Sequence, residues 1–177
     1  MAGLGLPKDT IRSLRRFVYI WKNESGMEAI VENESQTEDV MSYNHAKITY
    51  RLAKSLGRYD ERYDILPELE FELPYGRAKP DIAICLLGKA DWLRDVIRPT
   101  QPPLLAIEIL SPRQALSDLT DKALDVYFPS GTPAVWIIIP HFKQINVMIP
   151  DGEKTFTSGL VTDESTGIEL SLEDLFR

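Results

Sequence analysis

The stretch "PPLLAIEILSP", residues 102–112, indicates how the core of the protein is built. Prolines stand at both ends, and the apolar segment between them has the length of one fully buried strand. Glu108 lies in the middle of this segment. Removing a carboxylate from water is unfavourable unless another charge or a metal ion compensates. The stretch therefore predicts a central strand and, in addition, a group that faces Glu108.

The length and composition of the chain favour one soluble domain over residues 1–177. No apolar run is long enough to span a membrane, and the N-terminus becomes charged too soon for a signal peptide. Cys85 is the single cysteine, so no intramolecular disulfide can form, and a cytoplasmic location is expected. The net charge of −7 argues against a general nucleic-acid coat protein, but it leaves room for a local basic surface.

The N-terminal region predicts a short amphipathic helix followed by acidic sequence. The apolar positions of this helix are Ile11, Leu14, Val18 and Trp21. Four basic residues fall near one side of it, and a solvated helix face is the favoured interpretation: Lys8, Arg12, Arg15 and Arg16. Residues 23–39 then indicate an acidic loop or a weakly specified strand.

The rest of the chain predicts a mixed sheet flanked by helices, which is an α/β (α+β mixed sheet) fold. Helical spacing predicts a helix over residues 43–56 with Gly57 as its C-cap, and another over 114–128. Strands are expected at 65–74, 80–87, 104–110, 134–140, 144–150 and 154–159, with a helical turn behind the N-cap Ser171. Two buried strands joined by one helix are usually parallel neighbours, so the helix 114–128 is expected to cross the sheet.

The phase of the helix 114–128 supplies a candidate partner for Glu108. An apolar stripe that faces the sheet contains Leu119, Ala123, Val126 and Tyr127. Lys122 lies inside this stripe, so its ammonium either extends to water or points at a buried anion. Asp81, directly after Pro80, opens a second apolar strand. Two carboxylates beside a lysine form a small oxygen-rich site of the kind that suits a Mg²⁺-type cation.

These residues resemble the PD-(D/E)xK nuclease superfamily and, more narrowly, the Uma-type family of restriction-endonuclease-like proteins. The resemblance rests on residues 80 to about 150, in the order of the family's motifs. The matching positions are Pro80 and Asp81, Glu108 to Pro112, Lys122 and Tyr127, and Gly131 and Trp136. In the simplest pattern of the superfamily the lysine lies two residues after the second acid, where this chain has Leu110. The resemblance therefore implies that Lys122, on the helix, takes the place of that lysine.

The resemblance implies a restriction-endonuclease-like core and metal-assisted hydrolysis of a phosphodiester bond. Asp81, Glu108 and the backbone carbonyl of Ile109 would hold Mg²⁺ or Mn²⁺, and Lys122 would orient water or stabilise charge on the phosphate. The implied substrate is nucleic acid, most simply DNA. The implied assembly is a homodimer, with no membrane partner. The loop of residues 88–103 is a candidate dimer contact or a candidate substrate-facing loop.

Several accessory roles stay open at this point. His45 matches a histidine of the family, although a polar residue near a helix N-terminus is the simpler interpretation. Tyr127 is expected to pack against the sheet, and Ser111 to cap the helix or turn after its strand. An N-terminal acid of the family corresponds to either Glu28 or Glu32.

Two other functions are alternatives to the nuclease. Glycoside hydrolysis also uses two carboxylates, but nothing here indicates an open cleft with sugar-stacking aromatics. The stronger alternative is a catalytically inactive nuclease-fold module that binds nucleic acid or protein.

Overall fold

The computed structural model describes residues 41–177 in full, and residues 17–22 and 28–33 by their backbone. Contacts divide the chain into two compact units, residues 1–40 and residues 41–177. A single domain over the whole chain therefore stays a prediction. In the first unit, β1 (Phe17–Lys22) pairs with β2 (Glu28–Asn33) as an antiparallel hairpin.

The predicted N-terminal helix is wrong where the structure describes the chain. Residues 17–22, which include Val18 and Trp21, form strand β1. The run "FVYIWK" consists mainly of β-branched and aromatic residues, whose strand preference outweighs the helical spacing of a few apolar positions. The other expected helix residues, Ile11 and Leu14, lie outside the described residues, as do the four basic residues Lys8, Arg12, Arg15 and Arg16.

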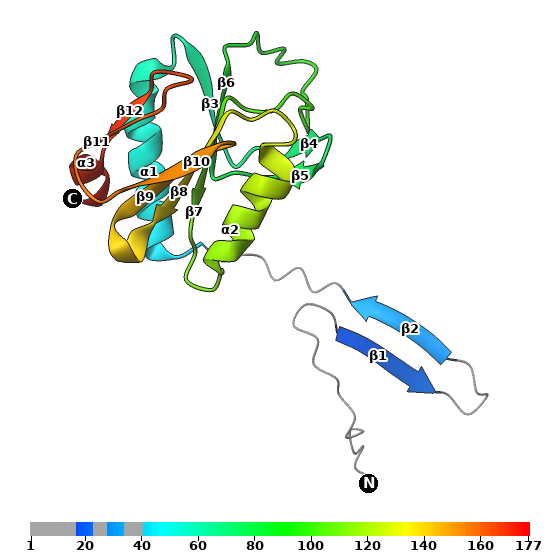
Figure 1. The fold of residues 1–177 in the computed structure, drawn as a ribbon. Coiled ribbons are helices and arrows are strands. Elements are labelled where there is room, and N and C mark those ends of the chain that lie inside the picture. Colours follow the sequence, from blue (N-terminus) through cyan, green and yellow to red (C-terminus); the bar gives the residue numbers. More distant parts are fainter. Residues whose placement is uncertain (1–16, 23–27, 34–40) are drawn as a thin grey trace. The chain divides into compact units, whose positions relative to one another are not determined.

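The second unit is built on a six-stranded mixed sheet with the strand order β10-β9-β8-β7-β6-β3 (Figure 1). These strands are β3 (Tyr63–Pro67), β6 (Ile82–Leu86), β7 (Leu105–Ile109), β8 (Ala134–Ile139), β9 (Gln144–Ile149) and β10 (Gly152–Phe156). Only β7 and β8 are parallel, and all other neighbours in this sheet are antiparallel. The predicted mixed sheet and its single crossover are confirmed.

Helices cover both faces of this sheet (Figure 1). On one face α1 (Tyr43–Leu56) packs through its apolar stripe, and α3 (Leu172–Phe176) adds to the same core together with β11 (Leu160–Thr162) and β12 (Glu169–Ser171). On the other face lies the crossover helix α2 (Leu116–Lys122), which continues as a π-helical turn (Ala123–Tyr127). The hairpin β4 (Phe71–Leu73) and β5 (Gly76–Ala78) packs on this second face.

Three local predictions differ in detail from the structure. The strand expected over 65–74 is divided into β3 and β4, because Glu68 adopts a left-handed conformation with φ of 58°. Gly57 caps α1 but keeps a right-handed conformation, because the chain continues into a 3₁₀ turn (Gly57–Tyr59). The short pair β11 and β12 was not predicted.

Two other sequence features are explained by the structure. Gly131, at the end of the crossover, has φ of 98°, which a residue with a side chain rarely adopts. Ser171 caps α3 as predicted, since its hydroxyl accepts a hydrogen bond from the Asp174 N–H at 3.2 Å. Within the described residues, no helix has both the length and the apolar character needed to cross a membrane.

Candidate active site

Acidic side chains occupy the same end of three adjacent strands. β6 and β7 pair as Ile82 with Ile107, and continuing this register by one residue sets Asp81 opposite Glu108. On the other side of β6, the Glu68 N–H donates to the Asp81 carbonyl at 3.2 Å, which continues the pairing with β3. Glu68, Asp81 and Glu108 therefore occupy neighbouring positions at one end of β3, β6 and β7. Their carboxylates are held from different sides, because Asp81 contacts His45 on α1 and Glu108 contacts Lys122 and Tyr127 on the α2 side.

Glu108 is buried, with 4% of its surface exposed, and it has two hydrogen-bond donors. The Lys122 ammonium donates to Oε1 at 3.0 Å, and the Tyr127 hydroxyl donates to the same oxygen at 2.6 Å. The predicted pairing of Glu108 with Lys122 is confirmed as a contact. All described side-chain hydrogen bonds of Glu108 go to Oε1, and none goes to Oε2.

The π-helical turn explains how Lys122 and Tyr127 reach one atom. Residues five positions apart in an α-helix point about 140° apart, at 100° per residue. In the turn after Lys122 the Phe128 N–H donates to the Ala123 carbonyl at 3.0 Å, so one extra residue is accommodated. The wider turn brings both side chains to the sheet side of the helix. Tyr127 thus packs against the sheet as predicted and, in addition, hydrogen-bonds Glu108.

Asp81 is held by contacts from two other elements. Its Oδ1 lies 2.6 Å from Nε2 of His45 on α1, and its Oδ2 accepts the Ile109 N–H at 2.6 Å. The other ring nitrogen of His45, Nδ1, lies 3.1 Å from the hydroxyl of Ser111. His45 therefore contacts Asp81 and Ser111 and is more than a polar residue near the N-terminus of α1. Ser111 contacts His45 through its hydroxyl. It does not cap α2, whose N-cap is Ala115, but it opens the turn after β7, since its carbonyl accepts the Gln114 N–H at 3.0 Å. A capping role of Ser111 in that turn stays a prediction.

Glu68 is the site residue that the sequence analysis missed. His45, Glu68 and Asp81 each offer one possible ligand atom, and these three atoms lie within 4.8 Å of one another. The Glu68 carboxylate also pairs with the Lys79 ammonium at 2.5 Å. Glu68 stood inside an alternating stretch that predicted one continuous strand. Glu68 itself adopts the left-handed conformation that breaks this stretch, and the sequence gives no clear signal of that conformation. Glu28 and Glu32, the acids considered instead, lie in β2, where only the backbone is described.

The electrostatics of the site are dominated by burial and by close charges. Loss of hydration raises the pKa of Glu108 above its usual value, Lys122 and the Tyr127 hydrogen bond oppose this, and Asp81 adds to the rise. The hydrogen bond to Asp81 raises the pKa of His45 in spite of burial, which acts in the opposite direction. Burial beside Glu108 raises the pKa of Tyr127, so the hydroxyl remains a proton donor. Asp81 and Glu108 are thus hydrogen-bonded by groups from three elements: α1, β7 and the α2 segment.

A mixed sheet between helical layers, with acids at the ends of neighbouring central strands beside a lysine, defines a restriction-endonuclease-like class of protein. The sequence model of the Uma2 family, described as "Putative restriction endonuclease", matches residues 20–177, and the chain belongs to this family. The crystal structure of "a putative nuclease belonging to DUF820" from Anabaena variabilis is similar, with a TM-score of 0.68 and 23% sequence identity. The similarity covers 76% of this chain and 81% of that chain, and it shows the fold. No curated protein matches the sequence.

Proposed function

We propose that the protein is a metal-dependent nuclease that hydrolyses phosphodiester bonds of nucleic acid at the Asp81–Glu108 site. The observation that carries this proposal is the register of β6 and β7, which, continued by one residue, sets Asp81 opposite Glu108, with a lysine ammonium 3.0 Å from the Glu108 carboxylate. Membership of the family supports a nuclease function. The proposed cation is Mg²⁺ or Mn²⁺, since both accept hard oxygen ligands.

The donor atoms of the site fit such a cation. Asp81 supplies carboxylate oxygens, and Oε2 of Glu108 has no described hydrogen bond. In an antiparallel ladder, a residue directs its N–H and C=O groups to the same neighbour, so the Ile109 carbonyl faces the β6 side together with its N–H. The residue opposite Ile109 by register is Pro80, which has no N–H to donate. These atoms support Asp81, Glu108 and the Ile109 carbonyl as the ligand set.

A divalent cation in this position would supply a Lewis acid and a bound water of lowered pKa. In the proposed reaction, Lys122 stabilises the negative charge that develops on the scissile phosphate. Its side chain is 27% exposed, so the ammonium has access both to Glu108 and to a bound substrate. Tyr127 holds Oε1 of Glu108 and so fixes the direction of Oε2.

The remaining polar residues orient the acids. His45 holds Oδ1 of Asp81, and Ser111 holds the opposite edge of the imidazole ring. We include Glu68 as a further acid of the site, because its carboxylate lies close to both His45 and Asp81. DNA as the substrate, a homodimer and a cytoplasmic location complete the proposal.

The second candidate is an inactive nuclease-fold module that binds nucleic acid or protein. The observation that favours it is the Lys122–Tyr127–Glu108 cluster. There the buried carboxylate already has a cationic partner and a hydroxyl partner without any metal ion. Such a cluster is able to persist as part of the core after a loss of activity.

A cleavage assay with matched proteins decides between the two candidates. Wild type and Glu108→Gln, purified identically, are incubated with single- and double-stranded DNA and RNA in Mn²⁺, in Mg²⁺ or in EDTA. Gln keeps the size of the side chain and an acceptor for Tyr127, but it lacks the charge. We expect metal-dependent cleavage by the wild type alone. Equal cleavage in the Glu108→Gln sample would indicate a contaminating nuclease, because a contaminant is unaffected by the substitution.

Thermal unfolding provides the second readout. An ion that binds only the folded protein stabilises it by about 2.7 kcal/mol at a hundredfold excess over its dissociation constant. We expect Mn²⁺ to raise the Tm of the wild type and to have little effect on Glu108→Gln. If neither Mn²⁺ nor Mg²⁺ at millimolar concentration raises the Tm of the wild type, and no nucleic acid is cleaved, the binding module is the better interpretation.

A further inference from the structure

The outward face of α1 and the 3₁₀ turn that follows it carry a row of cations. Lys47, Arg51 and Lys54 on α1, and Arg58 in the turn, follow one another at intervals of four, three and four residues, which places them on one side. The buried residues Ile48, Leu52 and Leu56 lie on the side that faces the sheet. Residues 41–59 contain no Asp or Glu, although the whole chain has a net charge of −7. The row is thus a concentrated positive charge on an acidic protein.

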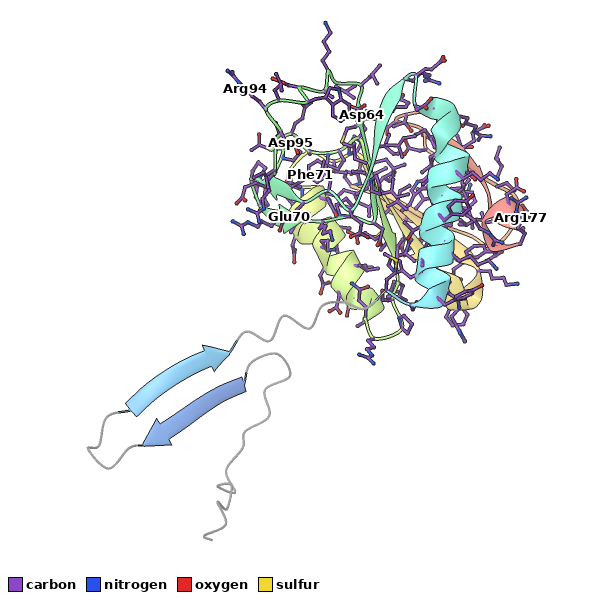
Figure 2. The ribbon with its side chains drawn as sticks, turned by 180° about the vertical axis from the view of Figure 1, so that it is seen from behind. Asp64, Glu70, Phe71, Arg94, Asp95 and Arg177 are labelled. Atoms are coloured by element: carbon purple, nitrogen blue, oxygen red, sulfur yellow. The ribbon has the colours of Figure 1, made fainter. Side chains whose placement is uncertain are left out.

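This face borders a cleft between α1 and the C-terminal segment. The cleft has a volume of about 590 Å³, and all four cations of the row line it. Arg177, at the end of the chain beside α3, contributes a fifth cation to the lining. Figure 2 shows Arg177 on the α1 side of the sheet, away from Phe71 on the α2 side. The acids of the lining are Glu169 and Asp174, and Asp174 lies 3.8 Å from Arg177.

The two arginines of the row are fixed in place by backbone carbonyls. Arg51 donates to the carbonyl of Leu175 at 2.9 Å, and Arg58 donates to the carbonyl of Glu169 at 2.5 Å. A guanidinium has five N–H donors, so each arginine retains donors for a second acceptor. Lys47 and Lys54 are exposed, and neither forms an ion pair within the described residues. The ammonium of Lys47 lies 5.9 Å from the centroid of the Tyr43 ring. The cleft therefore presents both arginines held by carbonyls and lysines without an ion-pair partner.

We propose that this basic face, formed by Lys47, Arg51, Lys54, Arg58 and Arg177, binds the phosphate backbone of a nucleic-acid strand. From Lys47 to Arg58 the row extends about 16 Å, at 1.5 Å per residue. That length corresponds to about five nucleotides of a B-form strand at 3.4 Å each. A linear row of cations suits a linear polyanion better than a single small anion. The choice of nucleic acid as the polyanion rests on the proposed nuclease function.

The basic face is separate from the candidate active site. His45, which contacts Asp81, is on the buried side of α1 near its N-terminus, whereas the row lies on the outward side. Groups on this face do not reach the bond that is cut. They hold the strand and raise its local concentration, so they are expected to affect substrate affinity and leave the chemical step unchanged.

The test measures binding without cleavage. Binding of labelled single- and double-stranded oligonucleotides to the full chain is followed by fluorescence anisotropy in EDTA, over a series of salt concentrations. The test variant is Lys47→Glu/Lys54→Glu. The control is Lys143→Glu/Lys154→Glu, which makes the same charge change at two exposed positions, one in the connection from β8 to β9 and one on β10. Circular dichroism checks that each variant is folded.

We expect the test variant to lose at least about tenfold in affinity near 0.1 M salt. The slope of log K against log salt should become smaller by about 2, since two phosphate contacts are removed. The control should retain most of the affinity and the slope. Equal losses in the two variants, or wild-type binding by the test variant, would overturn the proposal. The proposal would also be overturned if the wild type bound an acidic peptide and bound no oligonucleotide. Failure of the cleavage assay with binding intact would instead overturn the nuclease function alone.

Discussion

Lys122 and Tyr127 donate to the same carboxylate oxygen, Oε1 of Glu108, from positions five residues apart on one helical segment. A regular α-helix would turn one of the two side chains away from the sheet, and the π-helical turn between them prevents this. π-helical turns inside helices occur frequently at functional sites. The π-helical turn is therefore what allows both donors to reach Oε1 of Glu108.

The Tyr127 hydroxyl is expected to stabilise the fold through Glu108. Tyr127→Phe removes a buried donor to a carboxylate, and hydrogen bonds to charged groups contribute about 1.5–3 kcal/mol. Tyr63→Phe is the matched control, because the Tyr63 hydroxyl donates to a neutral carbonyl, that of Thr166, at 2.8 Å. Urea unfolding should show the larger loss for Tyr127→Phe. Equal losses would mean that the bond to Glu108 has no special weight.

Lys122 is expected to act in the reaction and to contribute nothing to cation binding. In Lys122→Met the positive charge beside Glu108 is lost, so Mn²⁺ should bind as well as before or more tightly. Cleavage should nevertheless disappear, because the charge on the phosphate is no longer stabilised. Lys143→Met, at an exposed position, is the control. Loss of the Mn²⁺-induced rise in Tm in Lys122→Met would show that the lysine is needed to form the site.

The His45–Asp81 pair should make metal-free stability depend on pH. The pKa of His45 is raised in the folded protein, so the folded state binds its proton more tightly than the unfolded state. This stabilisation is fully present below the unfolded pKa of 6.5 and is lost as the pH rises through the folded pKa. In EDTA, the difference in free energy of unfolding between wild type and His45→Gln should therefore decrease from about pH 5 to about pH 9. A difference that grows over this range would contradict the assignment. The raised pKa of Glu108 acts in the same direction but is present in both proteins.

The loop of residues 88–103 is expected to contribute to a homodimer. Trp92 and Ile97 are 93% and 80% exposed, and large apolar side chains of this kind mark interaction surfaces when they cluster. Light scattering should give a dimer for the wild type, and Trp92→Ser/Ile97→Ser should shift it toward the monomer. Wild-type protein that stays monomeric across micromolar concentrations would show that the loop has another role.

The sequence predicts the centre of the fold better than its edges. β6, β7 and β8 are short apolar runs between turn residues, and the phase of the crossover helix set Lys122 toward Glu108. These signals are local, and burial makes them strong. The position of Glu68 depends on the pairing of β3 with β6, and strand register is a long-range property that one sequence does not reveal.

Two other features escaped prediction for physical reasons of a different kind. Residues 17–22 carry both helical spacing and strand-forming side chains, and short apolar runs of this type are ambiguous. The π-helical turn adds one residue to an otherwise regular pattern, and the sequence carries no separate signal for it.

The side chain of Asp81 takes the place of a backbone acceptor at the end of β7. By register Pro80 lies opposite Ile109, and the Ile109 N–H donates at 2.6 Å to Oδ2 of Asp81. A relative that had lost all catalytic activity would still need this acceptor to finish β7. The Pro–Asp pair is therefore poor evidence for a working enzyme when a genome is surveyed.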